Sequence, residues 1–241
     1  MSFMCFSASA SFTAAAFLIP TGVYCVYSSI ELKRYHYILM AFVPVFFGIQ
    51  QAIEGGVWLS MAANSHFYTR IFSIGFLFFS HFFWPFWIPL SAYFIARNKH
   101  CSRAWIKLVF AIVGTIMGLI FFVPFLFDPH LVQTNMCANS IQYSASSFLH
   151  AILGTSLPKY LYIAVIIIPL WISRDWAIKI FGVLILVSVI ATYLFYNYAF
   201  NSVWCFFSAV ISIYVVYLIR RPREFGYNYM IKNDGPPPED K

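Results

Sequence analysis

The chain has 241 residues, of which 61% are hydrophobic and only 10% are charged, and its formal net charge is +7. An ordinary soluble domain carries about 25% charged residues, so this composition excludes that class and predicts an integral membrane protein. The basic residues lie in short segments between apolar runs, where they set topology. The positive charge therefore does not indicate a nucleic-acid-binding protein.

Seven runs are long or apolar enough to cross a bilayer. They predict an all-α integral membrane fold, a seven-transmembrane-helix bundle within residues 1–219. We find no internal repeat, so the inverted-repeat architecture of many transporters has no support in the sequence. The predicted spans are about 9–30, 37–62, 68–96, 104–127, 159–173, 176–199 and 203–219.

The distribution of Lys and Arg predicts the orientation of the bundle, because cytoplasmic connections are enriched in these residues. With the C-terminus in the cytoplasm, 13 of the 15 Lys and Arg residues lie on the cytoplasmic side, and only Arg70 and Lys159 lie outside. The sequence thus predicts a multi-pass protein of the cell's inner membrane with its N-terminus outside. Residues 220–241, basic and then rich in proline, are expected to form a disordered cytoplasmic tail.

The longest connection, about 128–158, is predicted to face outside. Its later part, residues 147–153, could form a short interfacial helix or a lid. Cys137 in this connection and Cys5 near the N-terminus could pair as a disulfide in an oxidising periplasm.

Two ionisable residues stand inside apolar runs. Glu54 is the only acidic residue and His81 the only histidine in such a position. An ionisable group in hydrocarbon is costly, so each is a hypothesis for a functional site. At the helical rise, Glu54 lies roughly 12 Å and His81 roughly 15–20 Å from the outer ends of neighbouring helices, so they could meet. Such a pair suits proton transfer or metal binding, and the alternative is a satisfied interhelical polar clasp with Gln50 or Gln51.

Polar groups from at least four predicted helices converge on the outer half of the bundle. Gln50, Gln51, Glu54 and Trp58 recur at helical spacing on one face of the second helix. This convergence predicts an outward-facing polar and aromatic pocket, and the alternative is ordinary decoration of the membrane interface. The predicted pocket residues are Gln50, Gln51, Trp58, Ser80, Trp84, Asn197, Asn201 and Trp204.

A metal site is a further hypothesis for the same region. Cys5, Glu54, His81 and Cys205 have the ligand types that zinc or copper prefers. No CxxC or HxxxH spacing supports this set.

Four stretches carry a resemblance to a known family. They are residues 4–8 with 10–12, 47–55, 81–91 and 202–207. These stretches resemble motifs of an uncharacterised family of bacterial seven-helix membrane proteins. The resemblance implies a shared fold and no particular activity. It begins at Met4, so the preceding residues 1–3 depart from the family's pattern. If translation began at Met4, removal of that methionine would expose Cys5 as an N-terminal cysteine, whose amine and thiol form a chelating or nucleophilic pair.

Two other seven-helix classes fit less well. A retinal protein needs a lysine midway along its last helix, which residues 203–219 lack. The zinc-dependent ceramidase and adiponectin-receptor class needs several intramembrane histidines, and only His81 is present.

Three functions fit these observations. The first is binding or sensing of a small apolar molecule or lipid, with membrane lipids as partners. The second is an intramembrane enzyme acting on a lipid-like substrate, in which Glu54 and His81 are the catalytic or metal-ligating groups. The third is a proton-coupled transporter. The scarcity of ionisable groups in the inner halves of the helices argues against this function. The sequence indicates no oligomeric state.

Overall fold

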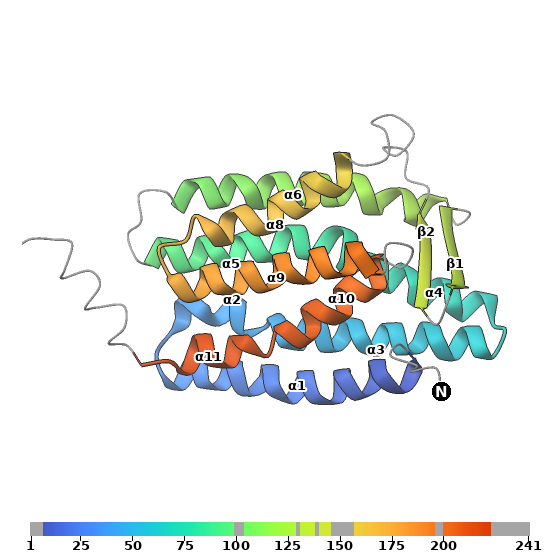
Figure 1. Ribbon diagram of the computed structural model, residues 1–241, viewed down its shortest axis with the longest axis horizontal. Helices are drawn as coiled ribbons and strands as arrows, with labels where there is room; N and C mark the ends of the chain where they lie inside the picture. The colour runs from blue at the N-terminus through green and yellow to red at the C-terminus, as the bar shows by residue number, and fades with distance from the viewer. Residues whose placement is uncertain are drawn as a thin grey trace, which may run out of the picture.

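The computed structural model describes residues 7–98, 104–128, 131–137, 140–145, 157–195 and 200–222. Figure 1 shows long helices side by side along one axis, with two strands near one end. We call the end that carries the strands the hairpin end, and the opposite end, where α11 stops, the tail end. The elements are α1 (Ala8–Glu31), η1 (Tyr35–Tyr37), α2 (Ile38–Ala41), α3 (Val43–Ala62), α4 (His66–Leu77), η2 (Phe78–Phe83), α5 (Trp84–Asn98), α6 (Ala104–Phe127), β1 (Val132–Cys137), β2 (Ser140–Ala145), α8 (Leu157–Trp171), α9 (Trp176–Phe195), α10 (Phe200–Ile211) and α11 (Tyr214–Arg220).

The predicted seven-helix bundle is present, although several of its helices are built from shorter pieces. Among the described residues, six helical segments are long and apolar enough to cross a membrane. The elements η1, α2 and α3 form one such segment of 28 residues, and α4, η2 and α5 form another of 32 residues. The remaining helix of the seven is α8 (Leu157–Trp171), the fifth in chain order, and it has 15 residues. Its length is therefore about 22 Å, less than the roughly 30 Å of a hydrocarbon core.

The helices α1 and α3 pack closely because glycine faces each contact. A Cβ atom on Gly22 would lie 2.5 Å from Val45, and one on Gly48 would lie 2.6 Å from Ile19. Both distances are below van der Waals contact, so any larger residue would push the helices apart. Close approach through small residues is how apolar helices gain packing energy in a membrane.

A π-helical turn, η2, interrupts the helix that runs from α4 to α5. The next residues include Pro85, which has no N–H to donate to the carbonyl of His81. A π-helical turn accommodates such a lost hydrogen bond. Gly114 of α6 packs directly on the Pro85 carbonyl, which a Cβ atom at position 114 would overlap. The irregular turn is thus held against α6.

The two strands differ from the predicted all-α fold, which treated this stretch as a loop. They pair antiparallel, with Val132 opposite Ala145. Ile141 and Tyr143, two residues apart on β2, are both buried, so one face of the hairpin packs on the bundle. A period of two over so few residues is too short to separate a strand from a loop in the sequence. The short helix expected at 147–153 lies outside the described residues.

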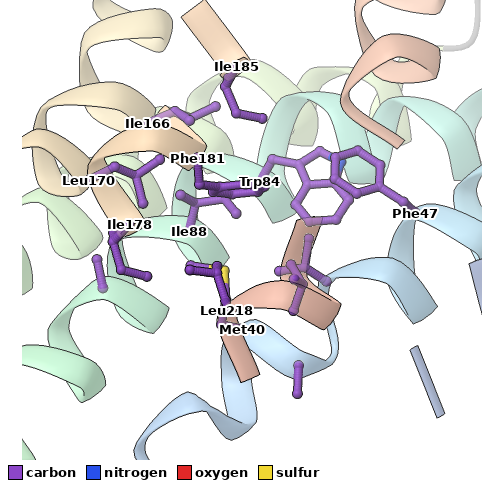
Figure 2. Packing of buried hydrophobic residues seen from close by; sticks show 14 of the residues in the cluster. Met40, Phe47, Trp84, Ile88, Ile166, Leu170, Ile178, Phe181, Ile185 and Leu218 are labelled. Atoms are coloured by element: carbon purple, nitrogen blue, oxygen red, sulfur yellow. The ribbon is translucent and has the colours of Figure 1, made fainter. Parts of the chain in front are cut away.

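The main apolar core takes buried side chains from α1, α2, α3, α5, α8, α9, α10 and α11. Figure 2 shows Phe47 of α3 beside Trp84 of α5, with Ile166 of α8 and Phe181 and Ile185 of α9 nearby. The rings of Phe47 and Trp84 stack with centroids 3.8 Å apart and an interplanar angle of 21°. Stacked rings add to the stability that burial of their apolar area provides.

A charged network that the sequence did not predict closes the tail end. Tyr37 of η1 donates a 2.5 Å hydrogen bond to Asp175, which precedes α9, and Arg221 forms an ion pair with the same carboxylate. Arg34 donates to the carbonyls of Ile219 and Arg221 at 2.7 and 2.8 Å. Burial lowers the pKa of Arg221, but hydrogen bonds to Asp175 and Tyr37 more than offset this and hold it above its ordinary value. The network joins the ends of α1, α9 and α11.

Candidate functional site

Glu54 joins two helices through its carboxylate. Its side chain is only 2% exposed on α3. Ser202 of α10 donates a 2.5 Å hydrogen bond to Oε1, and the amide of Gln51, one turn earlier on α3, donates a 3.1 Å hydrogen bond to Oε2. Both oxygens of the carboxylate therefore accept a hydrogen bond from a buried side chain.

Gln50 extends this arrangement to α5. The indole N–H of Trp84 donates a 2.7 Å hydrogen bond to Oε1 of Gln50. The amide of Gln50 also lies beside the thiol of Cys205, although Nε2 lacks the geometry of a hydrogen bond to it. We call Gln50, Gln51, Glu54, Ser202 and Cys205 the polar cluster. It brings together α3 and α10, and Trp84 attaches it to α5.

Two amide atoms of the polar cluster have no hydrogen-bond partner among the described residues. They are Nε2 of Gln50 and Oε1 of Gln51, and both side chains are fully buried. The amide orientations follow from the partners, because the Trp84 N–H needs an oxygen and the Glu54 carboxylate needs an N–H. A buried polar atom without a partner costs about 1–3 kcal/mol. The cluster thus presents one free donor and one free acceptor to whatever lies beside it.

The β-hairpin covers the polar cluster at the hairpin end. Tyr143 of β2 stacks on Phe76 of α4, with ring centroids 4.6 Å apart, and packs in the same apolar group as Cys205. Its hydroxyl is buried and has no partner within the described ranges. Burial raises the pKa of Tyr143 well above its ordinary value, and the nearby Glu54 and Cys205 raise it further. Tyr143 therefore places a third unpaired polar group close to the cluster.

An apolar cavity adjoins the polar cluster on its other side. Its volume is about 30 Å³. Trp84 and Cys205 belong both to its wall and to the contacts of Gln50, so the cavity and the cluster share a boundary. Several of the remaining wall residues appear in Figure 2. The wall consists of Phe47, Trp84, Ile88, Tyr162, Ile166, Leu170, Phe181, Ile185, Trp204, Cys205 and Ser208.

His81 has partners of its own, away from Glu54. Its Nδ1 lies 2.9 Å from the hydroxyl of Ser80, and its ring meets Phe125 of α6 edge-on with centroids 5.6 Å apart. Tyr162 of α8 donates a 2.5 Å hydrogen bond to the Ser80 carbonyl in the same π-helical turn. Glu54 faces α10 instead, so the hydrogen bond that the sequence suggested between Glu54 and His81 is not formed. Gln51 does bond to Glu54, but both residues lie on α3, so the interhelical bond of Glu54 is the one from Ser202 of α10.

The other predicted pocket residues are divided between several places. Trp204 lines the apolar cavity, whereas Trp58 packs against Val203. Ser80 lies with His81 in the π-helical turn. Asn197 lies outside the described residues, and so does the side chain of Asn201.

The described part of the chain contains no group of three or more His, Cys, Asp and Glu side chains that could hold a metal ion. Glu54, His81 and Cys205 are therefore not gathered as a three-ligand site. Cys5, the fourth suggested ligand, lies outside the described residues, as do its suggested disulfide with Cys137 and the side chain of that residue.

Sequence reasoning missed Ser202 and Tyr143 as members of the site. Ser202 stands three residues before Cys205 on α10, so helical spacing places both on one face. That spacing was a usable signal. Tyr143 carried no such signal, because its position depends on the pairing of the hairpin.

Comparison with known proteins identifies a family. The model of a family described as "Family of unknown function (DUF6629)" matches residues 4–228. The resemblance to an uncharacterised family is thereby confirmed, and the matched region includes every helix of the bundle. No curated protein sequence and no solved structure matches the chain.

Proposed function

We propose that this chain, which belongs to DUF6629, a family of unknown function, is a multi-pass membrane protein that binds a small, largely apolar molecule or lipid. The pocket consists of the polar cluster around Glu54 and the apolar cavity beside it. One observation carries the proposal: the buried amide of Gln50, whose Nε2 has no partner among the described residues, contacts Trp84 and lies beside Cys205, and these two residues line an apolar cavity. A bound amphipathic molecule would satisfy both features together, since binding sites pair apolar walls with a few polar groups.

The hairpin end of the bundle is proposed to face outside, with the protein in the cell's inner membrane. The basic residues support this placement, because Arg34 and Arg221 lie at the tail end and cytoplasmic ends are enriched in such residues. The pocket would then open toward the outer half of the membrane, with the hairpin above it. His81 would border the pocket region without contacting Glu54.

The arrangement of the described residues supports an intramembrane enzyme less well than a binding protein. No metal-ligand group of three gathers in the part of the chain that the structure describes, and His81 is not bonded to Glu54.

Native mass spectrometry of the purified protein tests the binding proposal. The wild type should release a co-purified small molecule or lipid when the detergent is removed in the gas phase. Ser208→Leu should reduce that bound mass, because the added methyl groups fill the cavity that Ser208 lines. Val210→Leu is the matched control, since Val210 lies on the exposed face of the same helix. A wild type without any bound mass, or equal occupancy in both variants, would contradict the proposal.

A further inference from the structure

We infer that the ligand of this pocket is an uncharged, single-chain amphiphile whose head group both donates and accepts a hydrogen bond, such as a primary alcohol or a primary amide. The inference rests on the proposed function and names the chemistry of its ligand. The head group lies at the polar cluster and the chain extends into the apolar cavity, through the boundary that Trp84 and Cys205 share.

The unpaired amide atoms define the head group. Gln50 offers an N–H from Nε2, so the ligand needs an acceptor there, and Gln51 offers Oε1, so the ligand needs a donor. A hydroxyl or a primary amide supplies both from one small group. The nearby Tyr143 hydroxyl can take either role.

The Glu54 carboxylate argues against a negatively charged head group. A fatty carboxylate would bring a negative charge beside the carboxyl group of Glu54, whose side chain is only 2% exposed. Charges repel strongly where water is excluded, and no positively charged side chain contacts Glu54 among the described residues. A carboxylate also has no proton to offer to Oε1 of Gln51. An ammonium group fails for the opposite reason, since it has no acceptor for the N–H of Gln50.

The apolar walls define the other part of the ligand. Ile166, Leu170 and Ile185 supply aliphatic wall from α8 and α9. Phe181 of α9 adds an aromatic ring to those of Phe47 and Trp84. The cavity is small, with a volume of about 30 Å³. Binding therefore requires the wall side chains to move apart, and a single flexible chain needs less of this movement than a rigid ring system.

Quenching of tryptophan fluorescence by brominated chains tests the head-group chemistry directly. Five compounds are titrated into the protein in nanodiscs. Each is an undecyl chain with a bromine at one end, and they differ at the other end, which carries an alcohol, a primary amide, a carboxylate, an amine or no head group. Trp84 and Trp204 line the cavity, so a chain inside it brings bromine against their rings. We expect the alcohol and the amide to bind about tenfold more tightly than the other three compounds, which leave a buried partner unpaired.

Variants locate the binding site. Trp204→Phe should remove much of the saturable quenching, because Trp204 lines the cavity. Trp176→Phe is the matched control, since Trp176 lies on the exposed side of α9 at the tail end. Quenching that Trp204→Phe leaves unchanged would place the chain outside the cavity and would overturn the inference.

Glu54→Gln should change the head-group preference. The new side chain can still accept from Ser202, but its NH₂ then faces Gln51, whose amide must turn to accept from it. This turn presents an N–H of Gln51 to the pocket in place of Oε1, and the negative charge disappears. Binding of the carboxylate should then improve about tenfold, while the alcohol and the amide lose affinity.

The results distinguish failure of the proposed binding function from failure of the head-group inference alone. If no compound gives saturable quenching and no co-purified molecule is found, the proposed function fails. If the carboxylate, the amine or the chain without a head group binds the wild type as tightly as the alcohol and the amide, the binding function stands and the head-group inference is wrong.

Discussion

Among single residues, Glu54 differs from many other buried polar groups because one of its hydrogen-bond donors lies on another helix. Many buried serines donate to a carbonyl of their own helix, as Ser188 does to Ile185. Such local bonds satisfy a polar group without joining elements. Ser202 instead donates to the Glu54 carboxylate on another helix, so this bond carries a contact between α3 and α10.

Ser202→Ala should therefore lower the free energy of unfolding by about 1.5–3 kcal/mol, because a buried carboxylate oxygen loses its donor. Ser188→Ala is the matched control and should cost less than about 1 kcal/mol, since it removes a bond within one helix. Equilibrium unfolding in mixed detergent measures both values. Equal losses in the two variants would show that the carboxylate contact contributes no more than an ordinary helical hydroxyl.

At the scale of elements, glycines set how closely neighbouring helices approach. Gly114 lets α6 lie against the Pro85 carbonyl at the π-helical turn, where no Cβ atom fits. Gly75 on α4 offers more room, because a Cβ atom there would lie 3.3 Å from the flexible side chain of Ile53. The two positions therefore differ in how much a methyl group should disturb.

Gly114→Ala should destabilise the bundle by about 1–3 kcal/mol, since the added methyl group must push α6 away from α5. Gly75→Ala should change stability by less than that, because the Ile53 side chain can shift and alanine favours the helix. Thermal unfolding followed by circular dichroism compares them. A larger loss for Gly75→Ala would mean that the contact between α5 and α6 is more yielding than its geometry indicates.

The hairpin is the other element with a testable role, because it lies over the polar cluster. Ser73 of α4 and Thr134 of β1 have their side-chain oxygens 2.9 Å apart, so paired cysteines should cross-link there. In a chain whose native cysteines other than Cys205 are replaced, the oxidised pair should slow labelling of Cys205 by a water-soluble thiol reagent. The same pair in reduced and blocked form is the control. Unchanged labelling after cross-linking would show that the reagent reaches Cys205 by another route.

At the scale of the whole molecule, sequence predicted the parts better than the contacts between them. Long apolar runs predicted the helices because membrane helices must satisfy their backbone internally. Periodicity predicted that Gln50, Gln51 and Glu54 share a face of α3. The bond of Glu54 to Ser202 and the ion pair of Asp175 with Arg221 join residues 148 and 46 positions apart. Local patterns contain no information about such pairs, and neither the hairpin pairing nor the tail-end network could be predicted.

Labelling of a cysteine at each end of the bundle tests the predicted orientation of the whole protein in the membrane. Phe67 lies at the start of α4, at the hairpin end, and Tyr35 lies at the start of η1, at the tail end, and both side chains are more than half exposed. In a chain without other cysteines, Phe67→Cys should react with a membrane-impermeant maleimide added to intact spheroplasts. Tyr35→Cys should react only after lysis, because the basic tail end is expected to face the cytoplasm. The reverse pattern would place the polar cluster and its hairpin toward the cytoplasm, and the ligand would then have to enter from that side.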